Sequence, residues 1–385
     1  MRLRYYLLII LGSLFAQCTK SEDYTVAAAD RELRDLANYS TEGFTPDTFC
    51  QFELIENIRG CWLRDVQVYR DCHYDLLFTR YNNGLTGADA TYSMPLPDGR
   101  IMWMFGDTFL GTVKADRTRE GAPFIRNSIV IQDEDELVTY YQNTSGSPSS
   151  YISPSDPDEW YWPLDATMHG GEIQMMLGRL EQIQANGAFS FAYVGFDLVT
   201  IDPADITIIS QQNKIADPDI SYGSCILEDG DYTYIYGISS RPFQKRAHVA
   251  RVQGGDLKDT WEYYNGQSWT DNPSSHIIAQ NVSDQFSIFK DGEIYYAVTH
   301  EIIFGNKIFI AQSTSPTGPF TNNRTLYCTP ETGGDIFTYN SFVHPELSEN
   351  GELRISYNIN SFDFTDLFSD VDLYRPRFIR VDNWR

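Results

Sequence analysis

Two aspartates border short apolar runs, at positions where a carboxylate could perform acid–base chemistry. Asp107 follows the run Ile101–Gly106 in the segment PDGRIMWMFGDTF, and Asp89 precedes the run TYSMP. Two carboxyl groups that share a site can serve as an acid and a base, because each changes the proton affinity of the other. The alternative is structural, since Gly-Asp pairs also form ordinary turns at strand ends. The choice depends on whether the fold brings the two side chains together.

A hairpin unit that recurs along the chain predicts the fold. Each copy has an apolar strand, a turn that contains glycine and a second strand of alternating or aromatic residues. The copies recur about every 60 to 70 residues, and their turn glycines are Gly99, Gly171, Gly230, Gly292 and Gly351. Aromatic residues make up 14% of the chain, which is usual for a sheet-rich protein. We predict an all-β fold, a five-bladed β-propeller.

The segments before the first complete repeat predict how the propeller closes. The last repeat lacks an outer strand, so we expect YDLLFTR (74–80) to complete the fifth blade. The propeller would then span residues 72–385. Residues 18–71 would form a tether and a small N-terminal elaboration.

Blade topology predicts which side chains meet. The inner strand of a blade runs through the ring and the second strand returns, so the start of one and the end of the other share a face. This rule brings Asp89 and Asp107 together near the axis as a catalytic pair. The same face should carry substrate-binding side chains, namely Trp162, Asp165, Arg241, His300, Glu301, Asn340 and Asn360. Tyr151 and Trp160 lie in a long insertion on this face, and with Trp162 they could stack on sugar rings.

Several of these residues have a structural alternative. Asp107 could cap a strand, Asp89 could bond backbone between blades, and Trp162 could pack between blades. His344, in FVHPELS, either lines the axial channel and contacts substrate or is a hydrogen-bonded core histidine.

Composition and missing motifs exclude several classes of function. The chain has 29 Lys and Arg against 53 Asp and Glu, a net charge of −24, which argues against a nucleic-acid partner. No Cys/His spacing fits zinc, and neither a G-x-S-x-G elbow nor a glycine-rich phosphate loop is present. We therefore expect no metal and no cofactor, a neutral polysaccharide or oligosaccharide as partner, and a monomer.

The N-terminus resembles a bacterial lipoprotein signal peptide over residues 1–17. Arg2 and Arg4 precede an apolar run from Tyr5 to Ala16, which is too short to span a bilayer. The run leads into LFAQC, in which Cys18 would be the lipidated residue. The resemblance implies an outer-membrane lipoprotein on the cell surface or the periplasmic face, held to the membrane by its lipid. The alternative is an ordinary secreted protein with a chance cysteine.

Five cysteines remain if Cys18 is acylated, so at least one thiol is free. Cys225 alternates inward in GSCIL and is predicted to be a buried free thiol. At least two of Cys50, Cys61 and Cys72 should lie close enough to bridge.

Three segments carry a family resemblance: GADATYSMPLPDGRIMWMFGDTFLG, YGSCILEDGDYTYIYG and NSFVHPELSENGELRISYNIN. They resemble bacterial five-bladed propeller families, formerly of unknown function, that are related to furanosidase-type, arabinanase-like glycoside hydrolases. The resemblance covers residues 72–385 and places the family's acidic pair on Asp89 and Asp107. Such enzymes also have a glutamate acid that opens the inner strand of blade 3. Here that segment reads Tyr222, Gly223 and Ser224, so the acid would come from elsewhere.

The sequence therefore predicts a lipoprotein with a propeller that cleaves a polysaccharide, one containing furanose sugars such as D-arabinan. The competing class is a non-catalytic glycan-binding lipoprotein of a polysaccharide uptake system. A purely structural scaffold is disfavoured because polar groups cluster on one face.

Overall fold

The computed structural model describes residues 53–385 except 58–59, 184–189, 216–218 and 242–243. The expected signal peptide, Cys18 and Cys50 lie outside the described residues. Among the described helices, none is long and apolar enough to cross a membrane.

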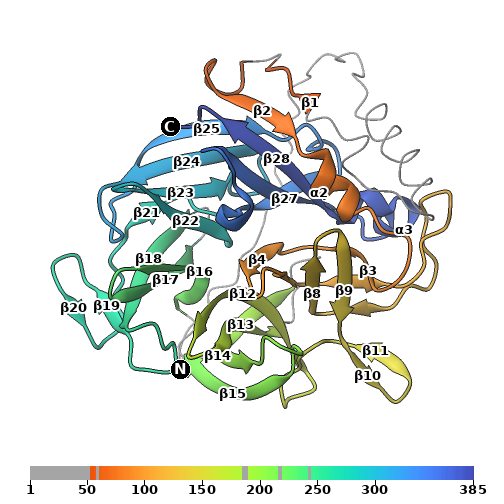
Figure 1. Cartoon of the computed structure of the whole chain (residues 1–385), viewed down its shortest axis with the longest axis horizontal. Helices are drawn as coiled ribbons and strands as arrows, with labels where there is room; N and C mark the ends of the chain where they lie inside the picture. The colour runs from red at the N-terminus through yellow and green to blue at the C-terminus, as the bar shows by residue number, and fades with distance from the viewer. Residues whose placement is uncertain (1–52, 58–59, 184–189, 216–218, 242–243) are drawn as a thin grey trace.

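Five antiparallel sheets surround a central axis, and they form the blades of an all-β propeller (Figure 1). Blade 1 contains β4 (Tyr92–Pro95), β5 (Ile101–Phe105), β8 (Ser128–Asp133) and β9 (Glu136–Tyr140). Blade 2 contains β12 (Glu159–His169), β13 (Glu172–Gln182), β14 (Phe191–Ile201) and β15 (Ile208–Ile215). Blade 3 contains β16 (Ser221–Asp229), β17 (Tyr232–Arg241), β18 (Gln244–Gln253), β19 (Glu262–Tyr264), β20 (Trp269–Thr270) and β21 (Ala279–Gln280).

The last two blades complete the ring. Blade 4 contains β22 (Phe286–Asp291), β23 (Ile294–His300), β24 (Lys307–Ser313) and β25 (Thr321–Cys328). Blade 5 contains β26 (Ile336–Val343), β27 (Leu353–Ser361), β28 (Pro376–Asp382), β2 (Gln67–Arg70) and β1 (Glu53–Leu54). Two small sheets lie outside the blades, one of β3 (Leu85–Ala88), β6 (Thr108–Leu110) and β7 (Phe124–Ile125), the other of β10 (Gln142–Thr144) and β11 (Ser147–Ser149).

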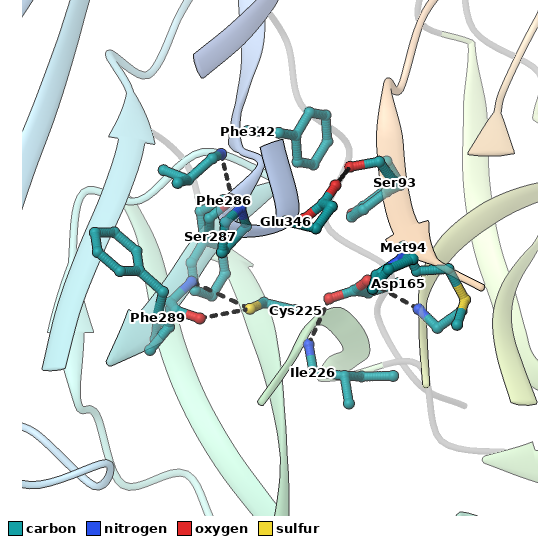
Figure 2. Close-up of a pocket in the computed structure, with 16 residues that line it drawn as sticks. Ser93, Met94, Asp165, Cys225, Ile226, Phe286, Ser287, Phe289, Phe342 and Glu346 are labelled. Atoms are coloured by element: carbon teal, nitrogen blue, oxygen red, sulfur yellow. Dashed lines mark hydrogen bonds between the residues drawn. The ribbon is translucent and has the colours of Figure 1, made fainter. Parts of the chain in front are cut away.

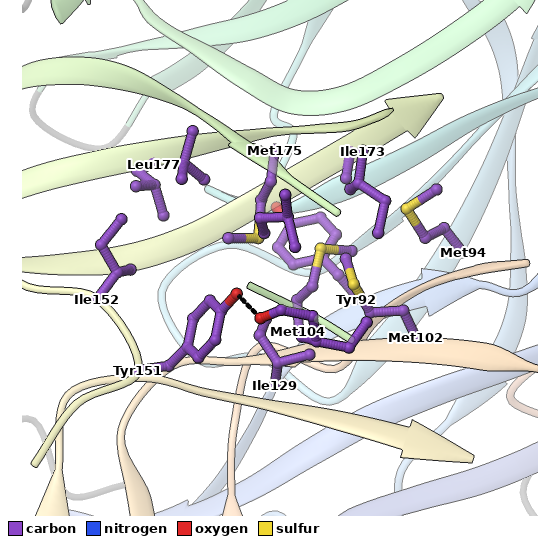
Figure 3. Close-up of a cluster of buried hydrophobic side chains, with 14 of the residues drawn as sticks. Tyr92, Met94, Met102, Met104, Ile129, Tyr151, Ile152, Ile173, Met175 and Leu177 are labelled. Atoms are coloured by element: carbon purple, nitrogen blue, oxygen red, sulfur yellow. Dashed lines mark hydrogen bonds between the residues drawn. The ribbon is translucent and has the colours of Figure 1, made fainter. Parts of the chain in front are cut away.

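Alternating side chains of each strand pack against the two neighbouring blades, as strand β5 illustrates. Met102 and Met104 join Met175 and Leu177 of blade 2 in one buried cluster (Figure 3). Trp103 and Phe105 point to the opposite side of the sheet and pack in a second cluster with Phe78 and Phe378. Both faces of a blade are therefore apolar, so the strands read as nearly continuous hydrophobic runs.

The fifth blade closes with a different strand from the predicted one. YDLLFTR is wrong as a strand, because residues 72–77 form helix α2 (Cys72–Leu77). The Asp71 carboxylate accepts a hydrogen bond from the Tyr74 amide at the helix start, and Tyr74, Leu77 and Phe78 bury one helical face. Strand β2 instead pairs with β28, so residues before 72 belong to the blade.

The cysteines confirm one prediction. Cys225 is a buried free thiol, as expected. Cys61 pairs with Cys328 of β25, and Cys72 is disulfide-bonded as well. The expected bridge among Cys50, Cys61 and Cys72 stays a prediction, because Cys50 lies outside the described residues. The disulfide at Cys61 ties the segment before β2 to the outer edge of blade 4.

Candidate active site

Pairing of the first two strands of blade 1 places Asp89 beside Asp107. Tyr92 of β4 lies opposite Met104 of β5, so the residues before β4 and after β5 emerge at the same end of the blade. The Gly106 amide donates a hydrogen bond to the Asp89 carbonyl at 3.0 Å. The two carboxyl groups lie close enough for the charge of Asp107 to raise the pKa of Asp89.

Gly106 leaves the room that the Asp89 carboxyl occupies. A Cβ atom at residue 106 would stand 2.7 Å from Oδ1 of Asp89 and 3.6 Å from Cδ1 of Trp162. Ala90, immediately after Asp89, has a φ of 57°, which costs energy for a residue with a side chain. Such local strain occurs often at functional sites.

Two tyrosines surround the Asp89 carboxyl. The Tyr339 hydroxyl donates to Oδ2 of Asp89 at 2.7 Å, and Tyr374 hydrogen bonds to the same carboxyl. Asn360 donates to the Tyr339 oxygen at 3.1 Å and so orients the hydroxyl toward Asp89. Burial, followed by the charge of Asp107, raises the pKa of Asp89 to about 7, although the tyrosine hydrogen bonds oppose the rise.

Asp107 has a cationic partner. Arg126 Nη1 contacts Asp107 Oδ2 at 3.1 Å, and Trp162 Nε1 donates to Oδ1 at 3.0 Å. The carboxyl is 15% exposed. Burial raises the pKa of Asp107, and the positive charge of Arg126 works against that rise. Arg126 therefore favours the ionised form of Asp107, whereas burial and the charge of Asp107 favour the protonated form of Asp89.

Aromatic side chains continue outward from Asp107. The Trp162 ring meets Phe191 edge-on, with 4.8 Å between centroids, and the Arg126 guanidinium lies 4.6 Å above the Trp160 ring. Trp162 thus lies directly beside the pair. Tyr151 was expected to stack on sugar rings, but it lies away from the site. Its ring is buried between blades 1 and 2, and its hydroxyl donates to the Ile206 carbonyl.

A family model described as a domain of unknown function, DUF5005, matches residues 71–384. The chain belongs to this family. A crystal structure from Bacteroides ovatus ATCC 8483, provisionally described as a hydrolase, is 30% identical with a TM-score of 0.77, and the match covers 90% of this chain and 98% of that chain.

Other solved structures resemble this DUF5005 chain more distantly. A GH43_1 enzyme from Xanthomonas citri in complex with xylose is 13% identical with a TM-score of 0.45, covering 78% of this chain and 88% of its own. An exo-β-1,3-galactanase from Phanerochaete chrysosporium is 11% identical with a TM-score of 0.44, covering 76% and 60%. No curated protein gives a significant match.

Asp165 of the DUF5005 chain faces the axial channel instead of the pair. It lines a cavity of about 190 Å³ that all five inner strands surround, and Figure 2 shows Asp165, Glu346 and Cys225 on its wall. Its carboxyl accepts hydrogen bonds from the amides of Ala166 at 2.8 Å and Ile226 at 2.7 Å. Burial raises its pKa to about 7. These contacts join blades 2 and 3 and place Asp165 on the cavity wall, so its expected role in substrate binding stays a prediction.

Both candidate histidines are core residues. His344 hydrogen bonds to Ser93 at 2.5 Å and Ser356 at 2.8 Å, and burial lowers its pKa to about 3. His300 is buried, with Nδ1 2.7 Å from the Ser341 hydroxyl and Nε2 3.0 Å from the Gly305 carbonyl. Burial lowers the pKa of His300 to about 4. Neither ring is available to a sugar, which corrects their assignment as substrate-binding residues.

The other predicted residues occupy different parts of the same end. Arg241 is exposed at the last position of β17. Glu301 is half-buried in the turn that His300 supports. Asn340 is half-buried with a φ of 53°, within a β-bulge of β26. The bulge follows Tyr339, whose hydroxyl points toward Asp89.

The segment 222–224, where the resemblance to propeller glycosidases implies a glutamate acid, holds no carboxyl. Ser224 is buried there, and its hydroxyl donates to the Asp284 carbonyl at 3.1 Å. Among the residues that the structure describes, no group of three or more His, Cys, Asp or Glu side chains could hold a metal ion.

Sequence reasoning missed three polar neighbours of the pair. Arg126 precedes β8, the third strand of blade 1, and the rule that placed Asp107 also predicts that a third strand starts at the same end. Tyr339 stands near the start of an inner strand, where the same rule applies. Tyr374 arrives from the segment before β28, and no repeat pattern marked it.

Proposed function

We propose that the chain is a glycoside hydrolase that cleaves a neutral polysaccharide containing furanose sugars, such as D-arabinan. The observation that supports this most strongly is the pair Asp89 and Asp107, whose surroundings give two adjacent carboxyls different proton affinities. Pairs of this kind supply the acid and the base or nucleophile in most glycosidases. The family resemblance of the sequence supports the sugar class.

The two carboxyls would divide the reaction between them. Asp89, protonated, would donate its proton to the glycosidic oxygen as the bond to the anomeric carbon breaks. Asp107 would be ionised and held in position by Arg126 and Trp162. It would act as the base or nucleophile on the side of the anomeric carbon opposite the leaving group. If Asp107 is the base, it takes a proton from the water that attacks the anomeric carbon, and Asp89 regains its proton from solvent. If Asp107 is the nucleophile, it forms a glycosyl ester that water then cleaves, and Asp89 takes the proton of that water. Tyr339 holds Asp89 in position throughout.

The pH profile of kcat/KM should identify these roles. We expect an alkaline limb near pH 7, because Asp89 must be protonated and its pKa is about 7, and an acid limb from the ionisation of Asp107. Tyr339→Phe removes a hydrogen bond that lowers the Asp89 pKa, so the alkaline limb should move to higher pH. Arg126→Gln removes the cation that lowers the Asp107 pKa, so the acid limb should move to higher pH. If each variant moved the other limb, the roles would be reversed.

The absence of a carboxyl at Ser224 favours a second candidate function. A chain that lacks the usual acid of blade 3 could bind a glycan in the same place without cleaving it. It would then serve as the glycan-binding lipoprotein of a polysaccharide uptake system.

A polysaccharide panel separates the two functions. Purified protein is incubated with D-arabinan, L-arabinan, arabinoxylan, xylan and galactan, with release of reducing sugars and retardation in native affinity gels as two readouts. A hydrolase releases sugars from at least one member. A protein that is retarded by a member and releases nothing from any of them would be the binding lipoprotein.

We further propose that Cys18 carries the lipid of an outer-membrane lipoprotein, from the resemblance of residues 1–17 to a signal peptide. Cells that express the full chain should incorporate labelled palmitate into the protein, and Cys18→Ala should abolish the label. Labelling that persists in Cys18→Ala would exclude this anchor.

A further inference from the structure

Two loops beside the candidate active site expose large apolar side chains. One follows β23 and presents Ile303, 63% exposed, and the other follows β27 and presents Phe362 at 47% and Phe364 at 49%. Both loops follow the second strand of a blade, as Asp107 does, so they lie at the same end of the propeller. We call Ile303, Phe304, Phe362 and Phe364 the apolar platform.

Contacts between rings link the platform to Asp89. The Phe362 ring lies 4.5 Å from that of Phe337, and Phe337 lies 5.3 Å from Tyr339, which donates to Asp89. The platform therefore packs, through the buried Phe337, against a tyrosine that contacts the carboxylate pair.

Phe364 reaches the same carboxyl through a second series of rings. Its ring lies 6.0 Å from that of Phe109, and Phe109 lies 5.7 Å from Tyr374, which also hydrogen bonds to Asp89. Phe304 of the loop after β23 lies 4.4 Å from the Phe337 ring and 5.5 Å from the Phe362 ring, so the two loops meet on one side of the pair.

The loop after β23 holds its apolar side chains in a costly conformation. Ile303 and Phe304 have φ values of 59° and 55°, in the left-handed region that a β-branched residue rarely adopts. The buried His300 fixes the loop through the Gly305 carbonyl. Backbone strain of this kind persists where the surrounding structure imposes it, and it clusters at ligand clamps and active sites.

The chemistry of the platform fits a sugar chain. Exposed aromatic and apolar side chains gathered in a patch mark an interaction site, and flat rings offer a face to the C–H surface of a sugar. Trp162 and Phe191 approach the pair from blade 2, whereas the platform belongs to blades 4 and 5. Aromatic groups thus flank the carboxylates on two sides.

We propose that the apolar platform binds further sugar units of the polysaccharide, beyond the unit held at Asp89 and Asp107. The chain would then bind sugar units on both sides of the bond that is cleaved, and it would cleave bonds inside the polymer. This inference rests on the proposed function. Binding energy from remote units would be used at the reacting bond, so short substrates should be poor ones.

The test compares affinities for a polymer and a short fragment. The probe is the panel polysaccharide that retards the wild type most, together with the disaccharide of the same sugar and linkage, measured by calorimetry. Phe362→Ala and Phe364→Ala should each weaken polymer binding about tenfold and leave disaccharide binding unchanged. Phe362→Tyr, which keeps the ring, should bind as the wild type does, and Phe362→Leu should resemble Phe362→Ala. Tyr141→Ala is the control, since Tyr141 is 39% exposed and lies outside the platform.

Each outcome decides between the proposals. Unchanged polymer affinity in both alanine variants overturns the platform, and so does a wild type that binds no member of the panel. If the alanine variants bind the polymer more weakly than the wild type does, and the wild type releases no sugar, the platform is supported and the hydrolase is overturned. If the alanine variants instead convert a dimer into a monomer by light scattering and bind the polymer normally, the platform joins copies of the chain, and the inference fails.

Discussion

Asp107→Asn is expected to lower turnover of the susceptible polysaccharide about 10²–10⁴-fold, the usual cost of losing an acid–base group. The amide keeps the shape of the side chain and can still accept from Trp162, so affinity for a neutral glycan should change far less. Asp89→Asn should behave alike. The double variant should be little slower than either single one, because residues that act as a unit are not additive.

A matched control separates this loss from a general effect of charge. Asp205→Asn removes one carboxylate from an exposed turn of blade 2 whose cap bonds are local, and it should leave turnover unchanged.

Thermal unfolding at different pH adds a second check. The folded-state pKa of Asp89 is raised to about 7, so its stabilising contribution is complete at low pH and is lost as pH rises through 7. Asp89→Asn should therefore raise the Tm above pH 7. Normal turnover in Asp107→Asn would return Asp107 to the role of a strand cap.

Gly106→Ala is expected to cost about 10²-fold in kcat/KM, because small displacements of reacting groups have effects of that size. Its Cβ would stand 2.7 Å from Asp89 Oδ1, so the carboxyl must turn away from its place beside Asp107. The backbone itself tolerates alanine, since φ at this residue is not positive. A lower kcat/KM with an unchanged melting curve would show that only the position of the Asp89 carboxyl has changed.

Gly333→Ala is the matched control for this substitution. Nothing lies within 4 Å of a Cβ at residue 333 and its φ is not positive, so both activity and Tm should be retained. A fully active Gly106→Ala would mean that the exact position of Asp89 does not matter to the reaction.

The sequence could predict features that follow from spacing and strand direction. Regular hairpins predicted the propeller, and the order of the first two strands predicted that Asp89 and Asp107 emerge at one end. Strand direction does not determine where a side chain points once a strand is irregular. A β-bulge between Pro163 and Ala166 turns Asp165 toward the axis, and bulges commonly redirect side chains in this way.

Two other errors have local causes. YDLLFTR is as apolar as a strand, but Asp71 caps it as a helix and the spacing of Tyr74, Leu77 and Phe78 suits one buried helical face. The histidines were misassigned because both are buried, and no pattern along the chain reveals their burial. His300 and His344 lie at positions suitable for a site, yet both point into the protein and bond to serines.

The central claim is that Asp89 and Asp107 hydrolyse a glycosidic bond, and one side-by-side assay tests it. Release of reducing sugars from the five panel polysaccharides is measured for the wild type and for the Asp89→Asn/Asp107→Asn double variant, with binding to the same polysaccharide as reference. We predict release by the wild type from at least one member, and binding without release by the double variant. Equal release by both proteins, or binding without release by the wild type, would contradict the account.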